Sequence, residues 1–259
     1  MAALDGVGVL VTRPLQQAMP LCLLLEAAGA TAIRLPAIVI DAAAALPDLE
    51  HRLGPIEDFD VVVFTSANAV RFGAPLLEGK HDQALAAIGP ATARALQEAG
   101  HRVTIVPAGG FDSEHLLLHP KFANPAGRRV LIVKGLHGRT ELHDELARRG
   151  AVVVNAEVYR RERALHGADL LAMVTAKLAA GEIQVITATS AEIAGHLLDS
   201  APAALRREYE RAHWLVPGPR VAAAVRERGL RAPLLHAATA LDQDLVGAIV
   251  RWRESESGA

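Results

Sequence analysis

Short apolar runs alternate along the chain with longer segments in which Ala, Leu and Arg recur at helical spacing. The apolar runs predict strands at residues 7–13, 61–66, 85–89, 102–107, 129–135, 184–190, 213–218 and 232–237. The segments between them predict helices at residues 15–28, 68–78, 91–99, 112–118, 139–149, 168–180, 191–210, 220–228 and 241–253. Glycines expected to end helices are Gly29, Gly100, Gly150, Gly181 and Gly229. Strands that are apolar on both faces and separated by helices are typical of parallel sheets covered on two sides.

Two segments, residues 31–43 and 151–164, are more extended than this alternation requires. Each follows a predicted helix that ends in Gly-Ala, and each carries β-branched residues beyond the length of one strand. We interpret them as the two crossings between domains. The first predicted domain is then discontinuous, residues 1–35 with 162–259, and the second is residues 36–161, including the crossing strands. Both have the usual size of an α/β domain.

The two predicted domains share a repeated pattern. FTSANAV (64–70) and TATSAEIA (187–194) both place Thr-Ser-Ala directly after an apolar run, and Gly-Pro with an Ala-rich helix follows in both. Two Ala-rich domains would share some of this pattern through composition alone, but two matched motifs in the same order favour a repeat. The predicted fold class is α/β, with two similar doubly wound parallel-sheet domains of the Rossmann or flavodoxin-like kind and a cleft between them.

Candidate ligand-binding residues gather where strands end. In open α/β sheets, ligands bind outside the carboxyl ends of the strands, where the next helix offers free backbone N–H groups to anions. The small, hydroxyl and basic residues at these ends are Thr12, Arg13, Thr65, Ser66, Asn68, Gly89, Thr92, Lys134, Gly135, Gly138, Arg139, Thr189, Ser190, Gly218, Pro219 and Arg220. Each of these strand ends alone is typical of a plain helix cap. Together they predict a cleft lined with anion-binding amides.

The segment EVYRRER (157–163) lies on the second predicted crossing. Alternation along a strand places Tyr159 and Arg161 on one face and Arg160 on the other. From position alone, a hinge with solvated arginines and a tyrosine that reaches the ligand explain this segment equally well.

Composition narrows the class of protein. Aromatic residues are 3% of the chain, the net charge is −2 and the pI is about 6.6, which argue against a nucleic-acid or anionic-membrane partner. The lone cysteine, Cys22, favours a reducing compartment. No secretion signal and no apolar run of about 18 residues is visible. We expect a cytoplasmic monomer that acts on a small molecule.

The usual motifs of cofactor and metal chemistry are absent. The chain has no G-x-S-x-G and no H-E-x-x-H. His115 and His119 have the spacing of a metal pair, but no third ligand is evident, so we interpret them as surface histidines. No cofactor and no metal are expected.

An ordered set of motifs resembles the uroporphyrinogen-III synthase family. The motifs are VLVTRP (9–14), FTSANAV (64–70), AIGPATARALQEAG (87–100), DSEHLL (112–117), VLIVKGLHGRTELHDELARRGA (130–151), VYRR (158–161), TATSAEIA (187–194) and VPGPRVAAAVRERG (216–229). They span the chain in order. One departure is GPRVA at 218–222, where the family often has Gly-Pro-Thr-Thr-Ala, which puts the role of Arg220 in question.

The resemblance implies both a fold and a reaction. The implied fold is two α/β domains joined by a two-stranded β-ladder. The implied activity is that of a cyclising lyase, which converts hydroxymethylbilane into uroporphyrinogen III with loss of water and inversion of ring D, without a cofactor. Tyr159 matches the family tyrosine thought to lie near the departing hydroxyl group. The strand-end residues, with Arg161, would bind the substrate's carboxylates.

Two other functions would use a similar architecture. A non-catalytic two-lobed protein that binds an anionic ligand, or a regulatory homologue, would share the cleft but would not need Tyr159. A phosphosugar isomerase would need a carboxylate or histidine base at a strand end, and none is visible.

Overall fold

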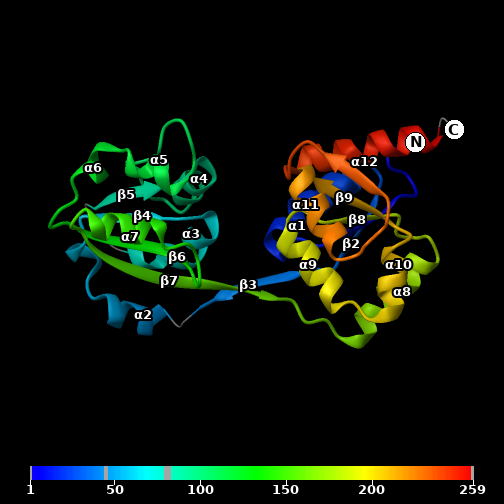
Figure 1. Cartoon of the computed structure of the whole chain (residues 1–259), viewed down its shortest axis with the longest axis horizontal. Coiled ribbons are helices and arrows are strands. Elements are labelled where there is room, and N and C mark those ends of the chain that lie inside the picture. The colour runs from blue at the N-terminus through cyan, green and yellow to red at the C-terminus, as the bar shows by residue number, and fades with distance from the viewer. Residues whose placement is uncertain (1, 44–45, 79–82, 258–259) are drawn as a thin grey trace. The chain divides into compact units, whose positions relative to one another are not determined.

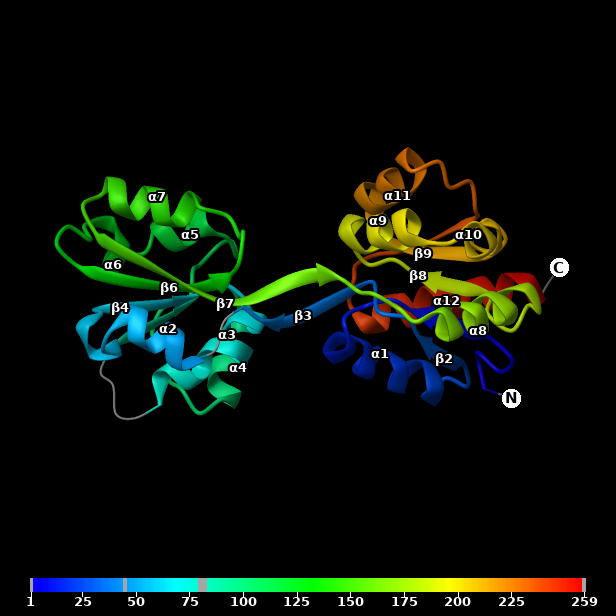
Figure 2. The same ribbon diagram turned by 90° about the horizontal axis from the view of Figure 1, so that it is seen from below.

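The computed structural model describes residues 2–43, 46–78 and 83–257, and its contacts divide the chain into two units (Figure 1). Unit 1 comprises Met1–Val39 and Glu162–Ala259, and unit 2 comprises Ile40–Arg161. The first division thus falls after residue 39, within a strand, whereas the sequence analysis placed it after residue 35. Each unit has its own sheet with helices on both faces (Figure 2).

The sheet of unit 1 has the strand order β10-β9-β8-β1-β2, and all its recorded pairs are parallel. Its strands are β1 (Gly8–Val11), β2 (Thr31–Arg34), β8 (Val185–Thr187), β9 (His213–Pro217) and β10 (Leu234–Ala237). Its helices are α1 (Leu15–Ala27), α8 (Ala168–Ala179), α9 (Ala191–Ser200), α10 (Ala203–Tyr209), α11 (Gly218–Glu227) and α12 (Asp242–Ser257). Val9 and Val11 share a core with side chains of α1 and α12, while α9, α10 and α11 cover the other face (Figure 2).

The sheet of unit 2 has the order β3-β7-β6-β4-β5. Its strands are β3 (Ile38–Ala42), β4 (Val61–Phe64), β5 (Ala84–Ala87), β6 (Arg129–Gly135) and β7 (Val152–Arg163). Its helices are α2 (Leu46–Leu53), α3 (Ala67–Gly73), α4 (Pro90–Glu98), α5 (Ser113–Leu117), α6 (Pro120–Ala123) and α7 (Glu141–Arg148), with 3-10 turns η1 (Ile56–Asp58) and η2 (Ala74–Leu77). Strands β4, β5, β6 and β7 pair in parallel, so their carboxyl ends meet at one edge.

The chain passes between the units in β3 and β7, which are neighbours in the sheet. The Ala43 N–H donates to Val158 O, and the Ala164 N–H donates to Ala37 O. Residue numbers rise along one strand as they fall along the other, so these two strands run antiparallel. This is the two-stranded ladder that the resemblance implied, and the α/β class with two largely parallel sheets is confirmed.

Most of the predicted elements are present, and the exceptions have physical causes. The strand expected at 102–107 is wrong, because only Ile105 forms a bridge, to Ala86, and Pro107 lacks the N–H that would extend the pairing. The helix expected at 191–210 is two helices, since Pro202 cannot continue α9. Helices α2 and α6 were not predicted.

Two further expectations bear on local geometry and on membrane segments. The glycines predicted to end helices all have positive φ, from 70° at Gly181 to 95° at Gly29, which confirms this part of the pattern. Within the part of the chain that the structure describes, no helix combines the length and apolarity needed to cross a bilayer.

Candidate functional site

The candidate site of unit 2 lies where β4, β6 and β7 end side by side. From Arg129 to Lys134 the pairing of β6 with β7 is regular, and it then shifts, so that Gly135 pairs with Tyr159. Thr65, just after β4, donates its N–H to Val133 O at 3.1 Å, which continues the edge on the other side of β6. Three strand ends are therefore within reach of one another.

The ring of Tyr159 crosses this edge over Gly135. A Cβ atom at Gly135 would lie 2.6 Å from Cζ and 3.0 Å from the hydroxyl oxygen of Tyr159. Only a residue without a side chain leaves room for the ring there. Phe72 of α3 stacks against the ring, with centroids 6.1 Å apart and an interplanar angle of 23°. Tyr159 is 8% exposed, so its position is set by packing.

The hydroxyl of Tyr159 ends 3.2 Å from Ser66 Oγ. Ser66 is also the N-cap of α3, and its Oγ accepts the Ala69 N–H at 3.0 Å. A serine hydroxyl has one hydrogen to donate and two lone pairs. The cap therefore uses one lone pair of the Ser66 oxygen. The hydroxyl hydrogen and the second lone pair remain available to Tyr159.

The loop after β6 is held by Lys134. This lysine is buried, and its Nζ donates to Gly138 O and Arg139 O, both at 2.8 Å. His137 in this loop has φ of 56°, a left-handed conformation that is uncommon for residues other than glycine. Lys134 thus shapes the loop, and Arg139, which is exposed, is the basic side chain that the loop presents.

The remaining predicted residues of unit 2 lie at or near the same edge. The Thr65 hydroxyl donates to Val133 O at 3.2 Å, and Asn68 is half-buried in the first turn of α3. Gly89 is the N-cap of α4, but no side chain caps this helix, and Thr92 is buried in its first turn. Arg161 is exposed near the end of β7.

In unit 1, two predicted residues are used inside the fold. Thr12 is 0% exposed, and its hydroxyl donates to Thr187 O on the neighbouring strand. Arg13 is buried, pairs with Asp242 and donates to Ala240 O. The Thr12 side chain therefore lies in the core and the Arg13 charge is neutralised by Asp242, so neither side chain is presented at the strand end.

The other predicted residues of unit 1 are at the surface of the strand ends. Ser190 is the N-cap of α9, and its Oγ accepts the Ile193 N–H at 3.1 Å, while Thr189 is half-buried beside it. The residues that open α11 are Gly218, with φ of 75°, and the exposed Pro219 and Arg220. These positions lie at the starts of two helices, where the first backbone N–H groups have no partner within the helix.

Two residues with clear roles were missed by the sequence analysis. Phe72 supports the ring of Tyr159, and its signal was its place on the helix that follows the Thr-Ser-Ala turn, in a chain with five phenylalanines. Asp242 neutralises Arg13, and its signal was an acidic residue opening a predicted helix.

No described part of the chain supplies a group of three or more His, Cys, Asp or Glu side chains that could hold a metal ion. His115 Nδ1 lies 2.7 Å from Asp112 Oδ1, the residue that caps α5, and His119 caps α6 by accepting the Lys121 N–H. Both histidines therefore have local structural contacts.

The fold and the site define a two-unit α/β protein. In unit 2 a buried tyrosine reaches the edge where strands end, and in both units helices begin at the strand ends. The family model described as uroporphyrinogen-III synthase HemD matches residues 21–240. The chain is 31% identical over 235 residues to the uroporphyrinogen-III synthase of Escherichia coli K12, covering 86% of this chain and 92% of that one. It is 32% identical over 214 residues to the Salmonella typhimurium protein of the same name, covering 81% and 84%. The chain belongs to the uroporphyrinogen-III synthase family.

Solved structures of the same name share the fold. A crystal structure of a mutant uroporphyrinogen III synthase from Thermus thermophilus matches with a TM-score of 0.60 at 21% identity, covering 98% of this chain and all of that one. The uroporphyrinogen-III synthetase from Helicobacter pylori 26695 matches with a TM-score of 0.59 at 14% identity, covering 95% and 99%. At these sequence identities the similarity to the solved structures shows the fold alone.

Proposed function

We propose that this protein is a uroporphyrinogen-III synthase, which cyclises hydroxymethylbilane to uroporphyrinogen III with loss of water and inversion of ring D. Similarity to named synthases over most of both chains supports the activity. The observation that carries the mechanism is the placement of the Tyr159 hydroxyl at the strand edge, over Gly135 and beside Ser66.

In the proposed reaction, Tyr159 is the proton donor. The C–O bond at the hydroxymethyl carbon of ring A breaks, and the oxygen takes a proton from Tyr159 and leaves as water. Electrons from the ring A nitrogen, which keeps its hydrogen, form a positively charged azafulvenium ion. Ring D attacks this electrophile through its substituted carbon and gives a spiro intermediate, which fragments and recloses with ring D inverted. Loss of a proton from the recyclised pyrrole restores aromaticity and can reprotonate Tyr159.

Ser66 is proposed to orient this proton. Its Oγ accepts the Ala69 N–H, and Tyr159 Oη lies within hydrogen-bond distance as an acceptor for the serine hydrogen. If Ser66 donates to Tyr159, the tyrosine hydrogen points away from Ser66 and is available to the departing hydroxyl. Ser66 is then a positioning residue, which acts through Tyr159.

The substrate has eight carboxylates, and its uncatalysed cyclisation gives the symmetric type I isomer. The enzyme must therefore hold a flexible polyanion in one conformation, and backbone N–H groups suit this task. We propose that substrate is bound by the helix starts after Gly89, Ser190 and Gly218, with Thr65, Asn68, Thr92, Thr189 and Pro219 beside them. The loop of Gly135 and Gly138 and the exposed Arg139, Arg161 and Arg220 would add hydrogen bonds and local positive charge.

We further propose that the protein acts in the cytoplasm as a monomer and needs no cofactor. The single cysteine, Cys22, is buried, and burial raises the pKa of its thiol, in keeping with a reducing compartment where it plays no reactive part. Sedimentation equilibrium at several protein concentrations would test the monomer. A mass of about twice 27.4 kDa at every concentration would contradict it.

The test of the activity is an isomer assay. Hydroxymethylbilane is supplied, the products are oxidised, and the type I and type III porphyrins are separated. We expect the type III isomer in excess and formation faster than in a blank. Type I alone, at the uncatalysed rate, would contradict the proposal, and tight substrate binding without conversion would instead identify a non-catalytic homologue.

A further inference from the structure

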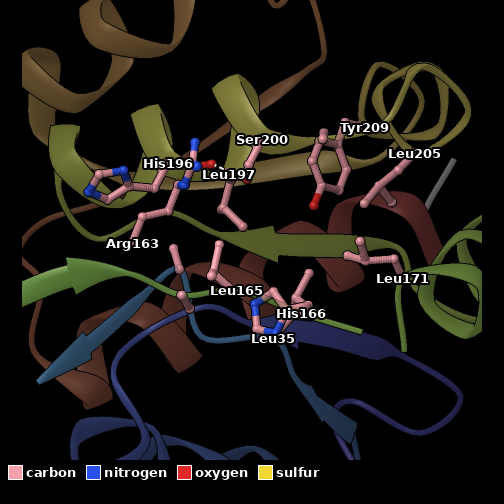
Figure 3. Close-up of a pocket in the computed structure, with 13 residues that line it drawn as sticks. Leu35, Arg163, Leu165, His166, Leu171, His196, Leu197, Ser200, Leu205 and Tyr209 are labelled. Atoms are coloured by element: carbon pink, nitrogen blue, oxygen red, sulfur yellow. Dashed lines mark hydrogen bonds between the residues drawn. The ribbon is translucent and has the colours of Figure 1, made fainter. Parts of the chain in front are cut away.

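Unit 1 contains a pocket of about 250 Å³ whose lining includes none of the residues proposed for catalysis (Figure 3). It lies among the chain after β2, the segment 163–166 at the end of β7, and the helices α8, α9 and α10. Leucines form most of its apolar wall, among them the buried Leu35, Leu197 and Leu205. At its rim Leu165 is 85% exposed, an unusual state for a large apolar side chain beside a cavity.

Tyr209 points its hydroxyl into this pocket (Figure 3). The residue is 1% exposed, and its ring packs edge-to-face on Trp214 with centroids 5.5 Å apart. The structure records no hydrogen bond between this hydroxyl and any of the residues it describes. Burial alone raises the pKa of Tyr209, so the hydroxyl stays protonated and can donate. The hydroxyl is therefore a donor that faces the pocket, and a ligand there can accept its hydrogen bond.

The other polar groups of the lining are basic or neutral. Arg163 and His196 lie toward the opposite end of the pocket from Tyr209 in Figure 3. His166 Nε2 is 2.9 Å from Pro36 O, a carbonyl that can only accept, so this nitrogen carries a hydrogen. No Asp or Glu side chain is among the described residues that line the pocket. Its electrostatics therefore favour an anion.

We propose that this pocket binds a small organic carboxylate. The carboxylate would pair with Arg163, an apolar ring or short chain would fill the leucine-lined centre and cover Leu165, and an electron-rich ring face or acceptor would meet the Tyr209 hydroxyl. A volume of about 250 Å³ suits a single ring with a short side chain. All the residues that line the pocket belong to unit 1, and a binding test there does not depend on the proposed synthase activity.

The chain's two tyrosines make a direct test possible. Protein labelled with ¹³C in the tyrosine rings is titrated with 3-phenylpropionate, and the two sets of ring signals are assigned with the Tyr159→Phe variant. We expect saturable shifts of the Tyr209 signals with a Kd of about 1 mM or tighter, and fixed Tyr159 signals. The matched neutral probe, 3-phenylpropanamide, should bind at least about tenfold more weakly, because it lacks the charge that Arg163 recognises.

Two variants separate the parts of the proposal. Arg163→Gln should weaken 3-phenylpropionate binding about tenfold, and since Arg163 is exposed its loss leaves the core intact. Arg207→Gln makes the same charge change on α10 outside the pocket lining and should leave the Kd unchanged. Signals of Tyr209 that do not move, shifts confined to Tyr159, equal affinity for acid and amide, or equal effects of the two arginine variants would each overturn the proposal.

Discussion

The two Thr-Ser-Ala turns have nearly the same backbone but different surroundings. Ser66 and Ser190 have (φ, ψ) of (−164°, 164°) and (−150°, 160°), and each accepts the N–H three residues ahead, at 3.0 and 3.1 Å. Only Ser66 also contacts a tyrosine, because β7 of unit 2 brings Tyr159 over Gly135. The strand ends of unit 1 instead turn Thr12 and Arg13 inward. The two turns therefore share a backbone conformation, and the tyrosine proposed for catalysis lies beside only one of them.

The largest effect is expected from Tyr159→Phe. The substitution removes the proposed proton donor but keeps the ring that packs on Phe72. We expect formation of the type III isomer to slow by about 100-fold or more, with activity remaining above zero because substrate is still held. The isomer assay measures this, and an unaltered melting temperature serves as the control. Unchanged turnover would remove Tyr159 from the mechanism.

Gly135→Ala should displace the Tyr159 ring, which crosses over Gly135. Its Cβ would lie 2.6 Å from the Tyr159 ring, so we expect a loss of about 1–3 kcal/mol in the free energy of unfolding and a reduced turnover. Gly167→Ala is the matched control, since a Cβ there meets nothing within 4 Å and φ is −64°.

A double variant identifies the cause of the Gly135 effect. Adding Tyr159→Ala to Gly135→Ala makes room for the new methyl group. The double variant should therefore lose less stability than the sum of the losses of the two single variants. Urea unfolding of the four proteins measures this coupling. Strict additivity would show that the strain at Gly135 has another source.

Ser66→Ala and Ser190→Ala form a matched pair that divides capping from catalysis. Each should lose about 1 kcal/mol of stability, because each removes the side-chain cap of a helix. Only Ser66→Ala should also lower kcat, by up to about tenfold, since it alone holds the Tyr159 hydroxyl. Any effect of Ser190→Ala on activity should appear in KM. Equal kcat for the two variants would contradict the positioning role of Ser66.

The smallest effect concerns His213, at the start of β9 and so at the opposite end of the strand from Gly218. Burial lowers its pKa below 6.5, an effect that the charge of Glu256 partly offsets, and its ring packs against Trp252. As the pH falls, the unfolded chain binds a proton at His213 before the folded protein does. His213 therefore lowers the free energy of unfolding from about pH 7 downward. His213→Phe should reduce the change in melting temperature between about pH 7 and pH 5 and leave turnover unchanged. A slope as steep as in the parent protein would assign the acid sensitivity to other groups.

The elements of the fold that depend on apolar runs and on glycine positions were predicted from the sequence. Buried parallel strands such as Val61–Phe64 are continuous apolar runs, and helices that end in glycine are marked by it. The segment at 102–107 was misjudged because strand propensity does not show whether a partner is present, and only Ile105 found one. Helix α2 was missed because its proline-containing start resembles a loop.

The sequence identified several residues of the candidate site but not their contacts, and it missed Phe72. Tyr159, Ser66 and Gly135 were all identified as site residues, yet nothing in the sequence indicates that they touch one another. Their meeting depends on the order of strands in the sheet and on the shift in pairing after Lys134. Likewise, Thr12 and Arg13 look like ligand-binding residues until Thr187 and Asp242 are seen to bind them.

That shift in pairing sets a constraint of another kind. Gly135 is opposite Tyr159 because β7 has one more residue than β6 at this point, Val158. At this irregularity Val158 and Tyr159 both lie against α3, the first beside Gly73 and the second stacked on Phe72, so successive side chains do not alternate there as they do in a regular strand. One extra residue thus allows two neighbouring side chains to pack on the same helix. The placement of Tyr159 therefore depends on the number of residues in β7 as well as on their types.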